Sequence, residues 1–141
     1  MQEVIKVDLI SRNIETVLVS KIKIILNTKF LSSRLCDLFG INYLTLIKKS
    51  RKRELVQARQ IIASFCYAMA KESLITISRH LDQDHATVLH SKKTVINLID
   101  TCNSFKEYIK YLCYNLYIDY DLFYKKLNTS KEYINQYYYK Y

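Results

Sequence analysis

The fold is decided by residues 54–100, which read ELVQARQIIASFCYAMAKESLITISRHLDQDHATVLHSKKTVINLID. In the first part of this stretch, apolar residues recur every three or four positions and therefore share one face of a helix. These residues are Leu55, Ala58, Ile62, Phe65 and Met69. The spacing predicts a helix over about 54–71.

The rest of the stretch has the pattern of two further helices joined by a tight turn. Ser73 is a favoured N-cap residue in front of a short helix, LITISRHL. After a polar turn at Asp82 and Gln83, Asp84 can cap a longer helix that runs to about residue 100. Two helices with a short connection, the second opening with polar groups at its exposed N-terminus, are typical of a helix-turn-helix.

Residues 27–47 continue the helical pattern toward the N-terminus. The segment KFLSSRLCDLFG has leucines at helical spacing and ends on Gly40, the residue type that most often follows a helix end. Asn42 is placed to cap another short helix. Because the chain has one glycine and no proline, it offers almost none of the turns that β-hairpins need. We therefore predict an all-α fold.

The two ends of the chain have weaker patterns. Residues 1–26 mix apolar and charged positions, and we predict helix there, although the isoleucine-rich run at 22–25 would also suit a strand. From Asn103 onward the chain is helical in pattern and rich in tyrosine. Its expected core stripe is Phe105, Ile109, Leu112 and Leu116, and the tyrosines expected to coat one broad side are Tyr108, Tyr111, Tyr114, Tyr117 and Tyr120.

The formal net charge of +9 is concentrated in the middle of the chain. Residues 48–93 carry ten basic and four acidic groups, a net of +6, whereas the flanking segments 1–47 and 94–141 carry +2 and +1. A basic surplus gathered in one third of a sequence favours a surface that faces a polyanion. Nucleic acid is the first expectation, ahead of an acidic membrane surface or a protein partner.

Several other classes are disfavoured by the composition. The four cysteines form no C-x-x-C pair, so buried reduced thiols are expected rather than zinc ligands or disulfides. No apolar run has the length of a membrane span, and the first residues lack the pattern of a secretory signal, which favours a cytoplasmic protein. No catalytic constellation is evident, so neither an enzyme nor a cofactor is expected.

The segment from Ser50 to Val95 resembles domain IV, the C-terminal DNA-binding domain of the bacterial replication initiator DnaA. Three blocks carry the resemblance in order: the basic run KKSRKR at 48–53, ARQ at 58–60, and DHATVLH at 84–90. With its flanking helices the similarity covers residues 27–102. It implies a Trp-repressor-like helix-turn-helix, flanked here by an N-terminal extension at 1–26 and a tyrosine-rich helical C-terminal extension at 103–141.

The resemblance also implies roles for individual residues in the basic run and the following helix. Arg51 matches the arginine that enters the minor groove, where a narrow A·T-rich groove has a negative potential that favours a guanidinium. The DNA-binding residues expected beside it in the run are Lys49, Lys52 and Arg53. Arg59, Gln60 and Lys71 match residues that bind phosphates and so set the register on the duplex.

The helix that starts near Asp84 is implied to enter the major groove. Asp84 can accept from cytosine N4, and His85 can hydrogen-bond a base edge. Thr87 is placed to contact a phosphate or a thymine methyl, and Ile75 matches a residue that packs against a thymine methyl. Two further expected DNA-binding positions depart from the family and change the expected readout. Gln83 takes the place of an arginine that reads guanine, and Ala86 takes the place of a threonine. Glutamine pairs best with adenine, so we predict that the initiator's usual box is not this protein's best site.

The function implied is sequence-preferring binding to double-stranded DNA in replication initiation or its regulation. The chain contains no G-x-x-x-x-G-K-[ST] loop, so ATP is not an expected partner, and a copy of the domain without the ATPase would suit a bacteriophage or another mobile element. The alternative is a structural or interaction protein, for example in a phage particle, that retains the fold but not base reading. Self-association through the tyrosine-rich helices is a further expectation.

Overall fold

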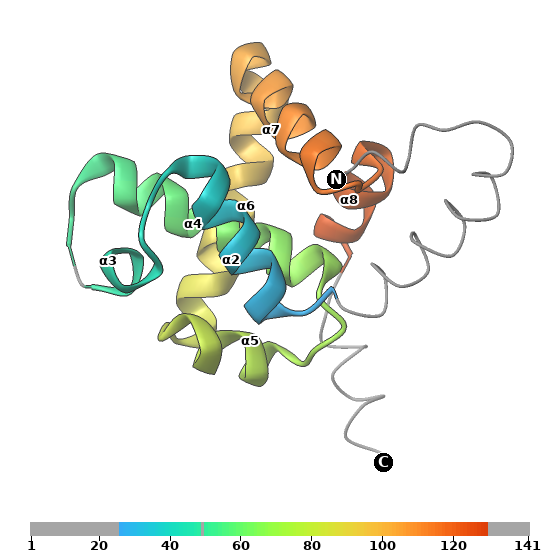
Figure 1. The fold of residues 1–141 in the computed structure, drawn as a ribbon. Helices are drawn as coiled ribbons and strands as arrows, with labels where there is room; N and C mark the ends of the chain where they lie inside the picture. The colour runs from blue at the N-terminus through green and yellow to red at the C-terminus, as the bar shows by residue number, and fades with distance from the viewer. Residues whose placement is uncertain (1–25, 49, 130–141) are drawn as a thin grey trace, which may run out of the picture.

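The computed structural model describes residues 26–48 and 50–129, which form helices joined by short connections (Figure 1). The helices are α2 (Thr28–Phe39), α3 (Tyr43–Ile47), α4 (Arg53–Met69), α5 (Leu74–Leu81), α6 (His85–Thr101), α7 (Asn103–Asn115) and α8 (Tyr120–Leu127). Within these residues there is no strand, which agrees with the predicted all-α class. The helix expected in residues 1–26 lies, but for Leu26, outside the described residues, as does the end of the tyrosine-rich segment.

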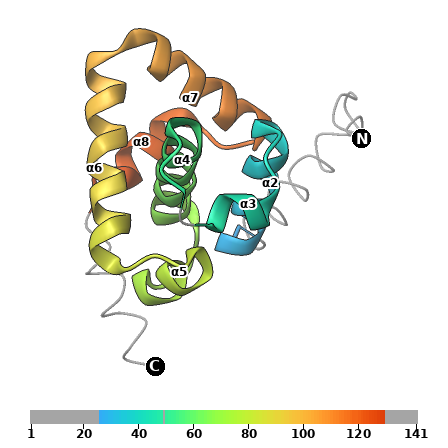
Figure 2. The ribbon, with the colours of Figure 1, turned by 90° about the vertical axis from the view of Figure 1, so that its left-hand side faces the viewer.

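Helix α4 lies in the middle of the molecule and packs against α2, α5, α6 and α8 (Figure 2). The sequence predicts one apolar stripe on this helix, but every residue from Ile61 to Ala68 is buried. The prediction included only one buried face. The other faces of α4 are buried as well, because α6 and α8 pack on their small side chains and on Tyr67. A helix that is buried on all sides belongs to the core rather than to the surface.

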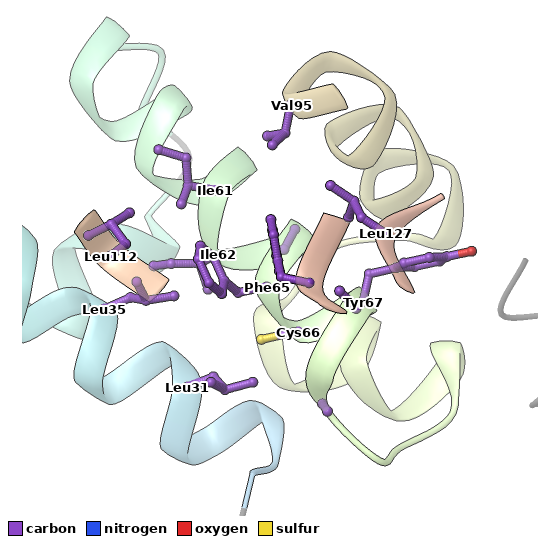
Figure 3. Close-up of a cluster of buried hydrophobic side chains, with 14 of the residues drawn as sticks. Leu31, Leu35, Ile61, Ile62, Phe65, Cys66, Tyr67, Val95, Leu112 and Leu127 are labelled. Atoms are coloured by element: carbon purple, nitrogen blue, oxygen red, sulfur yellow. The ribbon is translucent and has the colours of Figure 1, made fainter. Parts of the chain in front are cut away.

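The core forms where side chains from several helices meet α4 (Figure 3). Phe65 of α4 stacks on Phe123 of α8 with ring centroids 4.3 Å apart, and both side chains are fully buried. Leu31 and Leu35 of α2 reach the same cluster, and so do Val95 of α6, Leu112 of α7 and Leu127 of α8. The helix-turn-helix pair α5–α6 is therefore held on a core to which the C-terminal helices also contribute.

The helix ends agree with the predicted caps. The side chains of Asn42, Ser73 and Asp84 each accept a hydrogen bond from a backbone N–H in the first turn of the helix that follows. Gly40 ends α2 in the left-handed conformation, at φ 69°. These predictions are confirmed because capping is local, involving residues two or three positions apart.

Helix α4 ends two residues earlier than the sequence predicts. Ala70 turns to an extended conformation, and Lys71 and Glu72 lead from there to the cap of α5 at Ser73. Glu72 is held in this connection because its carboxylate accepts a hydrogen bond from the backbone N–H of Thr28, at 2.8 Å. This contact joins residues 44 positions apart in the sequence, so the periodicity of α4 alone does not predict where the helix ends.

The predicted reduced thiols are confirmed, and three of the four are buried. Burial raises the pKa of the Cys113 thiol to about 12 and also raises the pKa of Cys36. Cys102 differs because it lies between α6 and α7, where it is only partly buried, with its Sγ 3.3 Å from the hydroxyl of Ser104. None of the helices in the described part of the chain is long and apolar enough to cross a membrane.

Candidate nucleic-acid interface

The N-terminus of α6 presents its polar residues to solvent. Asp84 caps the helix by accepting a hydrogen bond from the backbone N–H of Thr87, at 2.7 Å. This hydrogen bond and a second one from the Thr87 side chain lower the pKa of the Asp84 carboxyl. His85, Ala86 and Thr87 are exposed in the first turn, so the helix tip is ionised at Asp84 and open to a partner.

The turn before this tip has an unusual backbone. Asp82 takes the left-handed conformation at φ 54°, and its N–H points back to the carbonyls of Ser78 and Arg79. The backbone N–H of Gln83 also returns to Ser78, at 2.9 Å. The Gln83 side chain is half-buried, and its Oε1 is shielded from solvent with no hydrogen-bond partner among the residues that the structure describes.

The basic run forms the connection between α3 and α4. Arg51 and Lys52 are exposed in this loop, and Ser50 Oγ accepts a hydrogen bond from the backbone N–H of Lys52, at 3.2 Å. Arg53 is exposed as well, but it is the first residue of α4 rather than part of the loop. Lys49 lies outside the described residues. The described cations of this run, Lys48, Arg51, Lys52 and Arg53, are thus available to an anionic partner.

Arg59 is half-buried and turned toward this loop. Its Nε donates to the carbonyl of Leu46 at 2.6 Å, and its Nη1 donates to the carbonyl of Ser50 at 2.8 Å. Its Nη2 donates to the carbonyl of Lys48. Gln60, the next residue of α4, is half-buried, and its backbone carbonyl accepts from Ser64 Oγ at 2.8 Å.

The loop and the helix tip open onto one cleft of about 530 Å³. Lys48, Ser50 and Arg51 line it from the loop, and Val56, Arg59 and Ile62 line it from α4. Asp82, Gln83, Asp84 and Thr87 line it from the α5–α6 turn and the first turn of α6. The basic loop and the tip of α6 therefore lie on the same side of the molecule. Arg51 and Asp84 are 33 residues apart in the sequence. Figure 2 faces the side of the molecule that carries the α3–α4 loop.

Other predicted residues lie away from this cleft. Ile75 is 37% exposed near the start of α5. Lys71 is exposed just beyond the end of α4 that is opposite to the loop. Since α4 has 17 residues, it is about 25 Å long at roughly 1.5 Å per residue, so Lys71 is far from Arg51. An interface that includes both must run along the whole length of α4.

Three polar residues of the cleft, and the apolar residues that line it, were missed by the sequence prediction. Lys48 and Ser50 belong to the basic run, and the charge of that run was the signal that could have found them. Asp82 was seen only as part of a turn, and no sequence signal showed that it would line the cleft. Within the described ranges no group of three or more His, Cys, Asp or Glu residues is placed to hold a metal ion.

Comparison with known proteins shows similarity to a bacterial protein family over the residues that form this site. A family model described as the bacterial DnaA protein helix-turn-helix matches residues 31–95. Two proteins named chromosomal replication initiator protein DnaA are also similar: that of Flavobacterium psychrophilum is 38% identical over 92 residues, which is 64% of this chain and 19% of the relative. That of Bacteroides thetaiotaomicron is 39% identical over 72 residues, covering 50% of this chain and 15% of the relative.

A third relative with the same name, from Wolbachia pipientis wMel, is 30% identical over 107 residues, covering 75% of this chain and 21% of the relative. The chain thus spans about a fifth of the length of the relatives it matches. No solved structure gives a significant match. The matched residues include α3, α4, α5 and the basic loop, together with most of α2 and the first part of α6. Residues 31–95 are therefore similar to the helix-turn-helix of the bacterial DnaA protein.

Proposed function

We propose that this protein binds double-stranded DNA with a sequence preference, placing the tip of α6 in the major groove and Arg51 in the adjacent minor groove. The observation that carries the proposal is the cleft shared by the basic loop and the helix tip. Neighbouring grooves of a duplex are separated by one sugar-phosphate strand, so a protein that enters both must make room for that strand. The cleft supplies such a space, with cations on its loop side.

The polar groups around the cleft suit this placement. Arg51 on the loop side has the charge and shape that a narrow minor groove favours. On the other side, the ionised Asp84 can accept from cytosine N4, and the exposed His85 can reach a base edge. Thr87 is exposed beside them and can contact the strand between the grooves. In this proposal Ile75 contacts a thymine methyl.

The biological role follows from the relatives, which are named as chromosomal replication initiators. We propose that this chain acts in replication initiation or in its regulation. The chain spans about a fifth of the length of those relatives, so we do not propose their other activities for it. The cytoplasmic location and the absence of an ATP partner expected from the sequence remain part of this proposal.

The decisive experiment is a binding selection on random duplexes, followed by titration of the selected site and of an unrelated duplex. Arg51→Ala should weaken binding to the selected site about tenfold, since one groove-reading contact contributes roughly 1–3 kcal/mol. Lys126→Ala is the matched control, because it removes an exposed cation from α8, whose residues do not line the cleft. The proposal is wrong if the selection enriches no sequence, or if both variants bind like the wild type.

The alternative, a structural or interaction protein, is motivated by Gln83 and Ala86, which replace base-reading residues of the family. The two functions differ in their response to salt. Groove binding releases counterions, so the logarithm of the binding constant should fall with the logarithm of the salt concentration, with a slope of about −0.9 for each phosphate contact. A flat salt response without preference over bulk DNA would favour the structural role.

A further inference from the structure

The guanidinium of Arg59 is enclosed by the backbone of the basic loop. Its three nitrogens donate to three carbonyls, those of Leu46, Lys48 and Ser50. These carbonyls belong to alternate residues along the end of α3 and the loop. A planar guanidinium has several N–H donors fixed in one plane, so it can hold several acceptors of a curved backbone at once.

The loop has few other interactions that would determine its shape. Helix α3 has only five residues, so most of its carbonyls have no partner within the helix. Inside the loop, the N–H of Ser50 donates to the carbonyl of Lys48, at 2.8 Å, and the N–H of Lys52 donates to Ser50 Oγ. Both are short-range bonds. Arg59 supplies the contacts that tie the loop to α4.

Arg51 lies inside the segment that Arg59 holds. It directly follows Ser50, whose carbonyl accepts from Arg59 Nη1 at 2.8 Å. The direction in which the Arg51 side chain leaves the backbone therefore depends on this bond. If the bond were lost, the loop would sample more conformations, and Arg51 would have to be ordered when DNA binds.

We propose that Arg59 is a positioning residue that shapes the basic loop and thereby presents Arg51 to the minor groove. The inference rests on the proposed DNA binding and differs from the phosphate contact that the family resemblance implies for Arg59. A phosphate contact needs only a positive charge within reach. Holding three carbonyls needs the planar fork, which a lysine cannot supply.

The first test is a double-mutant cycle between Arg51→Ala and Arg59→Ala, measured on the selected duplex. A residue that acts through Arg51 loses its effect when Arg51 is absent. We expect Arg59→Ala to weaken binding about tenfold in the wild type and less than about twofold in the Arg51→Ala background, which is a coupling of the size seen between interacting residues. Equal effects in both backgrounds would overturn the proposal.

The second test replaces Arg59 by lysine, which keeps the charge. The positioning role predicts that Arg59→Lys weakens binding about as much as Arg59→Ala, whereas a phosphate contact predicts binding near that of the wild type. Arg34→Lys is the matched control, because Arg34 is an exposed arginine on α2 that does not line the cleft. Circular dichroism of each variant verifies that the helices remain formed.

The third test uses the free protein and separates this inference from DNA binding itself. In Arg59→Lys, the backbone amides of Ser50 and Lys52 should exchange with solvent faster than in the wild type, while Arg34→Lys should leave them unchanged. If the wild type binds no DNA, the proposed function fails, yet the exchange still reports whether Arg59 holds the loop. Unchanged exchange at both amides in Arg59→Lys would overturn the positioning role, whatever the DNA result.

Discussion

At the scale of single residues, we propose that Gln83 determines part of the base preference. It lines the cleft beside the helix tip, and its Oε1 is shielded from solvent. Pairing with adenine uses this oxygen as the acceptor from N6, so the amide must rotate out of its shielded position to reach a base. The family resemblance implies an arginine that reads guanine at this position. In this proposal, the side chain determines the preference at one base pair, next to the ionised Asp84.

Gln83→Arg should move the preference of the protein toward guanine at one position of its site. A bidentate arginine contact favours guanine by roughly 1–3 kcal/mol, so enrichment of guanine should rise about tenfold. The measurement is a parallel selection with the wild type, with Gln83→Arg and with Gln83→Ala as the control. If all three proteins enrich the same sequences, Gln83 does not contact a base.

At the scale of an element, the start of α6 depends on one ionised cap. Hydrogen bonds from Thr87 lower the pKa of the Asp84 carboxyl, so the charged form is favoured in the folded state. A carboxyl whose pKa is lowered by folding stabilises the protein above its unfolded pKa, near about 4. That contribution is lost as the pH falls through the folded pKa.

Asp84→Asn should keep the capping hydrogen bond but remove the group that titrates, because asparagine also caps helices and does not ionise. We expect the stability of this variant to change less than that of the wild type as the pH falls from about 5 to 3. Urea unfolding followed by circular dichroism at a series of pH values measures the difference. Identical pH profiles for the two proteins would show that the cap carries no acid-sensitive stability.

Helix α8 is an element outside the residues that match the family, yet it belongs to the core. Phe123→Ala removes the ring that stacks on Phe65 and should lower the free energy of unfolding by about 3–5 kcal/mol, since it leaves a cavity beside α4. The exposed Leu122, one position before, is the control, and Leu122→Ala should cost far less. A small loss in Phe123→Ala would mean that α8 does not stabilise α4. The measurement is chemical unfolding.

At the scale of the whole molecule, α7 contributes no residue to the lining of the cleft. Tyr111 and Tyr114 are 56% and 80% exposed on this helix, and Tyr108 stacks on Phe39 of α2 with ring centroids 6.4 Å apart. The sequence predicts that the tyrosines coat one broad side. Tyr108, Tyr111, Tyr114 and Tyr117 are exposed, although Tyr117 lies beyond the end of α7, and Tyr120 is half-buried. Amphipathic aromatic side chains in such a row suit a protein contact.

The self-association expected from the sequence stays a prediction, and these tyrosines give it a test. The double variant Tyr111→Ser, Tyr114→Ser should sediment as a monomer at protein concentrations where the wild type forms a larger species. Lys125→Ser, an exposed change on α8, is the control and should sediment like the wild type. If the wild type is itself a monomer at every concentration, the tyrosines have another role.

The sequence by itself determined the helical elements, their caps and the charge of the loop. Periodicity and capping act between residues two to four positions apart, so Gly40, Asn42, Ser73 and Asp84 could each be interpreted from their neighbours. The three sequence blocks that resemble the DnaA family, at 48–53, 58–60 and 84–90, are also short continuous segments. These features are local, and local interactions do not depend on how the helices pack.

Only the tertiary structure decided how those elements meet. The bonds of Arg59 to carbonyls 9 to 13 residues away, the cover of α4 by α8, and the shared cleft all join segments that no short-range pattern relates. Such contacts depend on the direction in which each helix leaves the core. That direction results from side-chain packing across the whole molecule, which spacing along the chain does not specify.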